Sequence, residues 1–394
     1  MHRLNATVSP LLLQLIERSG STNGVLGPRL GEAIAGLSRL FTKERGAISQ
    51  AYLKDPVVAD AYLKYFLPVN LSKIQILIEE MPVPENVQRL SVLDLGSGPG
   101  TGALAVLDWW HRRRSAGALS VVTLDNVPAV LRKAGLLWNG YCHAAGITTA
   151  SLRTCEGNLE GRSWPEQIRD RSPFDLIIAA NCLNELFVDS KDSIGARAGL
   201  VAEVLALLAP HGTMMIIEPA LRETSRALQQ VRDRLLQEKR CTVYSPCLHE
   251  NSCPALINPD DWCHEERRWE APESIQQMDK EVGFIKDALK FSYLLLRKDG
   301  KTIIERRPDV YRVVSELRVM KGEKRAWLCN EQGRQEVGRQ DRLASPQNEV
   351  FDQWHRGAIV QIERIAHKER GGKVSALGRI EQDATVKVIR PVEL

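Results

Sequence analysis

The segment with the clearest chemical potential is a glycine-rich turn at residues 92–102, which read Val-Leu-Asp-Leu-Gly-Ser-Gly-Pro-Gly-Thr-Gly. An apolar run ends there at Asp94, and a helix-compatible stretch, residues 103–110, follows. Glycines at such positions let the backbone turn sharply and let a ligand approach main-chain N–H groups. The dinucleotide fingerprint G-x-G-x-x-G needs a third glycine where this chain has Thr101 or Ala103. The turn therefore predicts a bound ligand, but not through that fingerprint.

A second acidic residue closes the next apolar run, residues 120–125. Asp125 lies 25 residues after Gly100, near the offset of about 20 residues at which such folds place a carboxylate on ribose hydroxyls. An acid followed by G-x-G-x-G resembles the first motif of class I S-adenosylmethionine-dependent methyltransferases, which implies S-adenosyl-L-methionine as cofactor. The cofactor-binding residues predicted on this basis are Asp94, Gly96, Ser97, Gly98, Gly100, Asp125, Asn126 and Asn158.

The loop after the expected fourth strand, residues 181–185, is where a methyl acceptor would approach. It reads Asn-Cys-Leu-Asn-Glu, and Asn181 and Glu185 are the catalytic candidates. Methylases of exocyclic base amines often carry Asn/Asp-Pro-Pro-aromatic there, and this chain does not. Glu185 can act as a general base, although a helix-capping carboxylate is an equally good interpretation.

Four of the eight cysteines form a C-x5-C-x9-C-x65-C pattern. They are Cys247, Cys253, Cys263 and Cys329, and Cys241 competes as the fourth ligand. Ligation by four thiolates suits an iron–sulfur cluster or zinc. The spacing alone leaves both open, together with four unrelated thiols. The remaining cysteines are interpreted as small buried hydrophobes: Cys142, Cys155 and Cys182.

Apolar runs alternate with helical stretches in the middle of the chain. Strands are expected at residues 91–95, 120–125, 151–155, 174–180 and 212–218, and helices at 103–114, 127–145, 194–209 and 221–238. This alternation predicts an α/β fold with a parallel, doubly wound sheet. Because such sheets bind ligands at the carboxyl ends of their strands, the glycine turn, Asp125 and the loop 181–185 should meet there.

The flanking regions carry weaker patterns. Tyr52, Tyr62 and Phe66 recur near helical spacing and are expected to pack in a core. Runs at 311–319 and 324–329 are expected to add an antiparallel edge to the sheet. The predicted division is a helical N-terminal region (1–85), a Rossmann-like S-adenosylmethionine-binding domain (86–240), a Cys-rich insert (241–290), the end of the sheet with Cys329 (291–330) and a small basic β-rich appendage (331–394).

Composition is that of a globular chain with more than one domain, since 43% of its 394 residues are hydrophobic and 26% charged. No run reaches the roughly 18 apolar residues of a membrane helix, and the apolar N-terminus is interrupted by Gln14. We therefore expect a cytoplasmic location and no membrane contact. The residues from Arg297 onward include 21 Lys and Arg and 15 Asp and Glu. This surplus of positive charge is typical either of a nucleic-acid-binding surface or of an ordinary solvated surface.

Several segments together resemble one family over about residues 45–360. They are Ala51-Tyr52-Leu53, Asp94–Gly102, Asn184-Glu185-Leu186, Ile217-Glu218-Pro219, Ser245-Pro246-Cys247, Cys253-Pro254, Asp261-Trp262-Cys263-His264, Phe291-Ser292-Tyr293 and Leu328-Cys329. The chain resembles a bacterial member of the methyltransferase-like proteins of the small ribosomal subunit, best known from mitochondria. Ala220 departs from the Gly that the family commonly has there, which puts only the local turn in doubt.

That resemblance implies a Rossmann-like methyltransferase fold and a [4Fe–4S] cluster on Cys247, Cys253, Cys263 and Cys329, with zinc as the alternative. It also implies association with the small ribosomal subunit and its RNA. The function expected is an S-adenosylmethionine-dependent methyltransferase in subunit assembly, acting on ribosomal RNA. The alternative is a non-catalytic, RNA-binding assembly factor that binds the same cofactor. We expect a monomer away from the ribosome.

Overall fold

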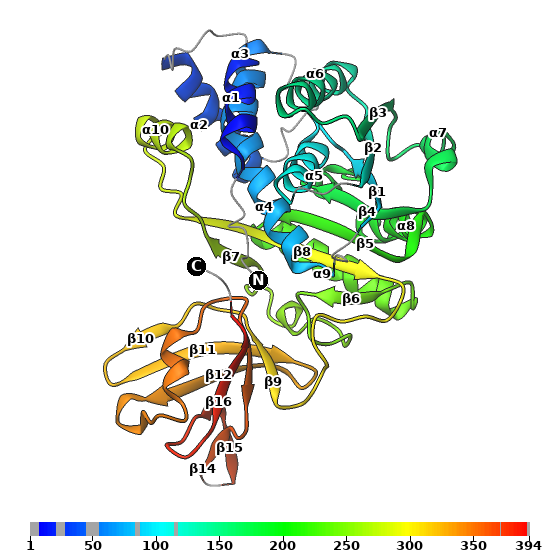
Figure 1. Ribbon diagram of the computed structural model, residues 1–394. Coiled ribbons are helices and arrows are strands. Elements are labelled where there is room, and N and C mark those ends of the chain that lie inside the picture. Colours follow the sequence, from blue (N-terminus) through cyan, green and yellow to red (C-terminus); the bar gives the residue numbers. More distant parts are fainter. Residues whose placement is uncertain are drawn as a thin grey trace.

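The computed structural model describes residues 8–20, 28–44, 55–82, 87–113, 117–370 and 372–391. It has two lobes, each built on its own sheet, and the N-terminal helices lie on the first of them (Figure 1). Tyr52, expected in a core, and the family segment 51–53 lie outside the described residues.

The first sheet is a doubly wound α/β sheet, as predicted. Its order is β3-β2-β1-β4-β5-β8-β6, and β7 pairs with β8 away from this path. The five strands β1 to β5 are parallel, and β8 runs antiparallel to β5. The strands are β1 (Arg89–Leu95), β2 (Ala118–Asp125), β3 (Ala150–Glu156), β4 (Phe174–Ala180), β5 (Leu208–Pro219), β6 (Thr242–Ser245), β7 (Glu265–Arg268) and β8 (Ala288–Arg297). The order 3-2-1-4-5 is that of the Rossmann-like fold.

Four helices between these strands lie close to the predicted ranges. They are α5 (Thr101–Arg112), α6 (Pro128–Ala145), α8 (Ser193–Ala206) and α9 (Arg222–Gln237). The short α7 (Trp164–Ile168), between β3 and β4, was not predicted, and α10 (Glu273–Val282) precedes β8. The central strands are apolar on both sides because helices cover both faces. The alternation was predictable because β1, β2, β4 and β5 contain apolar runs that are buried.

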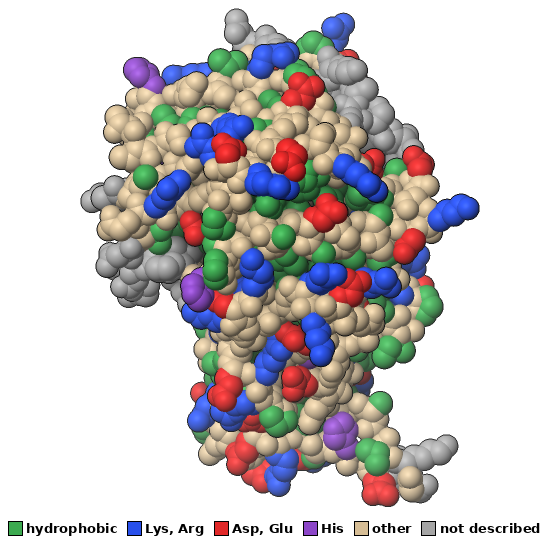
Figure 2. All heavy atoms as spheres, turned by 90° about the vertical axis from the view of Figure 1, so that its right-hand side faces the viewer, with side chains coloured by type: hydrophobic (Ala, Val, Ile, Leu, Met, Phe, Trp, Pro, Cys, Tyr) green, Lys and Arg blue, Asp and Glu red, His purple; other side chains and the backbone are tan. Residues whose placement is uncertain are grey.

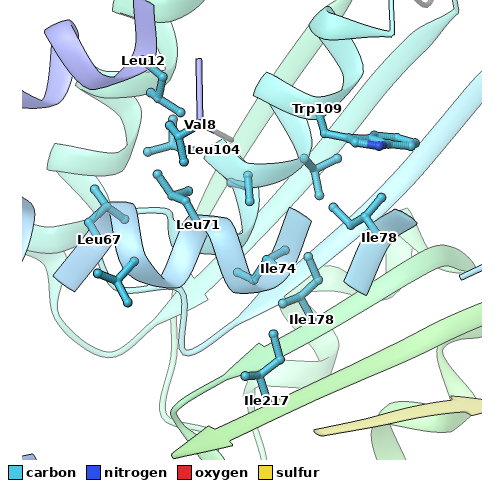
Figure 3. Close-up of a cluster of buried hydrophobic side chains, with 14 of the residues drawn as sticks. Val8, Leu12, Leu67, Leu71, Ile74, Ile78, Leu104, Trp109, Ile178 and Ile217 are labelled. Atoms are coloured by element: carbon cyan, nitrogen blue, oxygen red, sulfur yellow. The ribbon is translucent and has the colours of Figure 1, made fainter. Parts of the chain in front are cut away.

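An N-terminal helical layer covers one face of the first sheet. It contains α1 (Pro10–Arg18), α2 (Pro28–Thr42), α3 (Pro56–Ala61), a π-helical turn (Tyr62–Phe66) and α4 (Leu67–Glu80). Figure 3 shows Ile74 and Ile78 of α4 near Ile178 of β4 and Ile217 of β5, all of them buried. Each such side chain contributes about 1.5–3 kcal/mol by leaving water. In the described ranges, no helix is both long and apolar enough to cross a membrane.

The second lobe is a β-sheet that starts earlier than predicted. Its order is β14-β15-β12-β11-β9-β13-β16, with β10 on β11. The strands are β9 (Val310–Val313), β10 (Arg318–Met320), β11 (Glu323–Asn330), β12 (Gly333–Gln340), β13 (Ile359–Ile362), β14 (Ala366–Arg370), β15 (Lys373–Arg379) and β16 (Val386–Arg390). The assignment of 311–319 and 324–329 to the edge of the first sheet is therefore wrong. The antiparallel part of the first sheet consists instead of β8 with β6 and β7, because the β9 and β11 side chains pack in the second core.

On the face of the molecule that Figure 2 shows, the basic surplus is not gathered into one patch. On the face in Figure 2, Lys and Arg side chains lie among Asp and Glu over both lobes. Within the second lobe, Lys324 pairs with Asp352 at 2.8 Å and Arg325 pairs with Glu323 at 2.5 Å. These pairs favour a solvated surface over a nucleic-acid footprint for that cluster.

Buried polar contacts join the two lobes. Arg312 of β9 donates to Glu265 of β7 at 2.7 Å and to the Tyr293 hydroxyl of β8 at 2.8 Å. Tyr293 and Arg267 in turn donate to Glu80, at the end of α4, at 2.6 and 3.1 Å. Burial opposes ionisation of Glu80, but Arg312 and Arg267 outweigh it and lower the pKa to about 2. The lobes are therefore joined through charged side chains that are almost fully buried.

Candidate functional site

The glycine turn adopts a backbone that side chains would disfavour. Gly96, Gly98 and Gly100 have φ of +60°, +53° and +86°, a region that glycine enters without strain. A Cβ on Gly96 would lie 2.5 Å from Cβ of Cys182. The Gly98 N–H donates to the Asp125 carboxylate at 2.8 Å. The turn is thus fixed from both sides, by β2 and by the loop after β4.

Asp94 supports the turn from behind rather than facing a ligand. Its Oδ2 accepts the Ala103 N–H at 2.9 Å, and its carboxylate also accepts the Gly102 N–H. A Cβ on Gly102 would meet Asp94 Oδ1 at 2.5 Å. Burial raises the pKa of Asp94 to about 7 against these two hydrogen bonds. The residue ties the end of β1 to the first turn of α5.

A cavity of about 440 Å³ opens where the strands end. Seven of the predicted residues line it: Gly96, Gly98, Asp125, Asn126, Asn158, Asn181 and Glu185. Three do not, namely Asp94, Ser97 and Gly100, which shape the turn from within. Burial raises the pKa of Asp125, although N–H groups of Gly98 and Val127 stabilise its charged form. The cavity brings the cofactor and acceptor candidates together.

The loop after β4 is held in a strained shape at this cavity. Asn181 has φ +57°, which a non-glycine residue adopts at a cost that commonly marks functional sites. Its N–H donates to the carbonyl of Ile217 at 2.8 Å. Glu218 of β5 accepts the Asn184 N–H at 3.3 Å, and Arg197 of α8 donates to the Asn184 carbonyl at 3.0 Å. Neighbouring elements therefore fix where Asn181 and Glu185 lie.

The opposite wall comes from the N-terminal helical layer. Tyr62 and Phe66 of the π-helical turn line the cavity, as do Phe41 of α2 and Lys73 of α4. Burial raises the pKa of Tyr62 to about 12, so the phenol stays protonated. The prediction that Tyr62 and Phe66 pack against a core is confirmed, and both side chains also line the cavity.

A second, small cavity contains all four predicted thiols. Cys247 and Cys253 lie in the loops after β6, Cys263 precedes β7, and Cys329 is on β11 of the other lobe. Burial raises the pKa of Cys263 to about 11, with the neighbouring Cys247 adding to the shift. The cavity measures about 40 Å³, so it has no room for a nucleotide. Cys241 does not line it and packs against the core of the first lobe instead.

Two arginines of α9 hold this Cys-rich insert in place. Arg226 donates to the carbonyls of Ala255, Asn258 and Asp261 at 3.0, 2.8 and 2.7 Å. Arg232, fully buried, donates to the carbonyls of His249 and Asn251 at 2.5 and 2.9 Å. The insert, which showed no periodicity in the sequence, is therefore organised by side-chain contacts to its backbone.

No group of three or more His, Cys, Asp or Glu side chains close enough to hold one metal ion occurs among the described residues. His249 does lie at the thiols, with Nε2 3.6 Å from Cys329 Sγ. A single-ion zinc site is therefore not preformed. A cluster differs in that each cysteine binds a different iron, so its sulfurs do not converge on one point.

Comparison with protein families shows to which family the chain belongs. A family model described as mitochondrial small ribosomal subunit Rsm22 matches residues 56–339. The chain belongs to the Rsm22 family. The match spans the glycine turn and all four cysteines, and the resemblance predicted from the sequence is confirmed. Among curated proteins, a sequence search finds no match.

Solved structures align with this Rsm22-family chain at low sequence identity and low TM-score. A class I S-adenosylmethionine-dependent methyltransferase from Listeria monocytogenes shares 11% identity at TM-score 0.36, covering 75% of this chain and 88% of that one. The mitomycin 7-O-methyltransferase MmcR shares 13% at TM-score 0.37, covering 69% and 68%. A chain of the fibrillarin/Nop5p complex shares 11% at TM-score 0.32, covering 58% and 82%. These overlaps are too distant to inform on substrate.

Proposed function

We propose that this chain binds S-adenosylmethionine in the larger cavity and transfers its methyl group to RNA of the small ribosomal subunit. The observation that carries the proposal is the shared cavity: the glycine turn, Asp125 and the loop 181–185 all border it at the carboxyl ends of the strands. A doubly wound sheet binds nucleoside ligands at that edge. The family description supports the small subunit as partner.

Each residue at the cavity has a role in this proposal. Gly98 admits the cofactor because nothing lies within 4 Å of where its Cβ would be. Asp125 would accept hydrogen bonds from the ribose hydroxyls, and Asn158 lies at the adenine end. Asn181 and Glu185 would orient the acceptor, with Glu185 able to take a proton from it. Positioning of the two reactants supplies most of the rate in such a transfer.

A matched pair of variants tests this proposal. Gly98→Leu fills the cavity at a left-handed backbone position, whereas Gly146→Leu places the same side chain at φ +66° in open space at the end of α6. We expect wild type and Gly146→Leu to label small subunits from cells lacking the chain with methyl-tritiated S-adenosylmethionine. Gly98→Leu should not. Cofactor binding without any label in wild type would contradict catalysis and support the assembly factor.

We also propose that Cys247, Cys253, Cys263 and Cys329 hold a [4Fe–4S] cluster. The support is the donor set: three thiols of the insert and the distant Cys329, one of them buried and three half-buried, border one compact cavity. The pKa of the Cys329 thiol is raised by burial and then by each of the other three. Such a cluster would link the two lobes, since only Cys329 comes from the second. Chain purified without oxygen should contain about four irons and four sulfides. Colourless protein with one bound zinc would contradict the assignment.

A further inference from the structure

Two lysines line the larger cavity and form no ion pair with any of the described residues. Lys73 of α4 and Lys286, which precedes β8, both line it. Lys73 Nζ donates to Asn70 Oδ1 at 3.1 Å, and Lys286 Nζ lies 4.5 Å from the centre of the Tyr65 ring. Neither forms an ion pair with a carboxylate in the described part of the chain. Lys290, at the same cavity, does pair with Glu266 at 2.9 Å.

The two ammonium groups disfavour each other in the absence of a ligand. Burial lowers the pKa of Lys73 to about 7, and the charge of Lys286 adds to the shift. Burial also lowers the pKa of Lys286 to about 8, although Asp279 opposes this. Two cations that are partly desolvated and close together gain most from an anion that both can contact.

The sheet order places Lys286 away from the cofactor turn, and the charge of Lys286 acts on the ammonium of Lys73. The glycine turn follows β1 and Asp125 ends β2, whereas Lys286 leads into β8, which lies beyond β4 and β5. The loop 181–185, at the end of β4, separates the two groups. An anion on the lysines therefore belongs to the acceptor side of the cavity.

Aromatic rings form the adjoining wall. Tyr62 and Phe66 stack with their centroids 6.1 Å apart, and Phe41 meets Phe66 edge-on at 5.2 Å. All three rings border the cavity. Unstacked bases bind on such rings whatever their sequence.

We propose that Lys73 and Lys286 form a phosphate subsite for the methyl acceptor, which is one nucleotide unstacked from RNA with its base against Phe41, Tyr62 and Phe66. The inference rests on the proposed function, because it assigns the acceptor side of the same cavity. The cations and the rings together favour a nucleotide over a protein side chain as the methyl acceptor. A protein side chain would need neither two neighbouring cations nor a wall of three rings.

The test uses full-length chain saturated with S-adenosylhomocysteine and compares nucleosides with their 5′-monophosphates by calorimetry. The variants are Lys73→Met and Lys286→Met, and the control is Lys301→Met, an exposed lysine after β8. In wild type and the control, monophosphates should bind about tenfold more tightly than nucleosides, the effect of one charge-assisted hydrogen bond. In both cavity variants that advantage should fall to about onefold, with S-adenosylhomocysteine affinity unchanged.

Three results would overturn the inference. They are no phosphate advantage in wild type, an advantage that persists in both cavity variants, and a parallel loss of S-adenosylhomocysteine affinity. The third would assign the lysines to the cofactor carboxylate. Failure of the proposed function is distinguishable, because wild type would then either not bind S-adenosylhomocysteine or, while binding it, leave small subunits unlabelled in the methyl-transfer assay. Circular dichroism on each variant verifies that it is folded.

Discussion

At the scale of single residues, the glycines of the turn are required for different reasons. Gly96 needs both a left-handed backbone and the absence of a Cβ, because Cys182 occupies the space beside it. Gly98 needs only the backbone freedom, and the space at its Cβ position is open to the cavity. A side chain at Gly96 should therefore affect folding, whereas one at Gly98 should affect access of the ligand.

Alanine at each position should separate these effects without ligand. Gly98→Ala should lose about 1–2 kcal/mol of unfolding free energy, the cost of a left-handed residue with a Cβ. Gly96→Ala should lose at least about 3 kcal/mol, since the Cβ clash adds to that cost. Chemical denaturation of the ligand-free chain measures both. Equal losses would show that Cys182 moves aside without cost.

Asp94 should make stability depend on pH. Its folded pKa of about 7 lies above the ordinary 3.8, so between these values the folded chain retains a proton that the unfolded chain has lost. Stability therefore falls as pH rises through this window. Asp94→Asn has no such pH-dependent penalty. Any cost of the substitution to the hydrogen bonds with the two N–H groups is the same at every pH. Its melting temperature relative to wild type should rise by about 5 °C from pH 5 to pH 8, whereas a constant difference would contradict the buried acid.

At the scale of elements, α9 organises residues 253–264, whose one regular element is a short 3₁₀ turn (Pro254–Leu256). Four carbonyls of the insert accept from Arg226 alone, those of Ala255, Leu256, Asn258 and Asp261. Hydrogen bonds of this kind replace the ladder that a helix or strand would provide. The position of Cys253 and Cys263 therefore depends on a helix of the Rossmann-like lobe.

Replacing Arg226 should loosen the insert and leave the larger cavity intact. Arg226→Gln cannot reach these carbonyls together, so amide exchange over residues 253–261 should quicken about tenfold. Arg234→Gln is the control, because Arg234 is exposed and bonds to Glu238 on its own helix. Affinity for S-adenosylhomocysteine should change in neither variant. Unchanged exchange in Arg226→Gln would contradict this role.

The elements that sequence could predict are those with a local pattern. The strands that end at Asp94 and Asp125, and the helices after them, follow from apolar runs and glycine positions. The cavity wall from Tyr62, Phe66 and Lys73 could not be predicted, because their spacing equally suits a core helix and only tertiary packing brings α4 over the strand ends. The second lobe was misjudged for the same reason: β9 and β11 have ordinary strand patterns, and nothing local says which sheet they join.

At the scale of the whole molecule, two sites contribute to the contact between the lobes. One is the buried network of Arg312 with Glu265, Tyr293 and Glu80. The other is the thiol cavity, where Cys329 of β11 meets three cysteines of the insert. Strand β8 lies beside both cavities, because Lys290 borders the larger and Ser292 and Tyr293 border the smaller.

Breaking the network should uncouple the lobes. Arg312→Met leaves Glu265 without its 2.7 Å partner in a buried site, which should cost about 3–5 kcal/mol. Arg318→Met, which removes an exposed partner of Glu336 in the same lobe, should cost at most about 1 kcal/mol. Urea denaturation should show two transitions for Arg312→Met and one for the control. A single unshifted transition in Arg312→Met would exclude the network as the link.

Calorimetric titration of the full chain with S-adenosylhomocysteine tests the central claim most directly. One equivalent should bind to wild type and to Gly146→Leu, and none to Gly98→Leu, because only the last side chain enters the cavity at the glycine turn. Folded wild-type protein that binds no S-adenosylhomocysteine, or a Gly98→Leu variant that binds it as wild type does, would contradict the account.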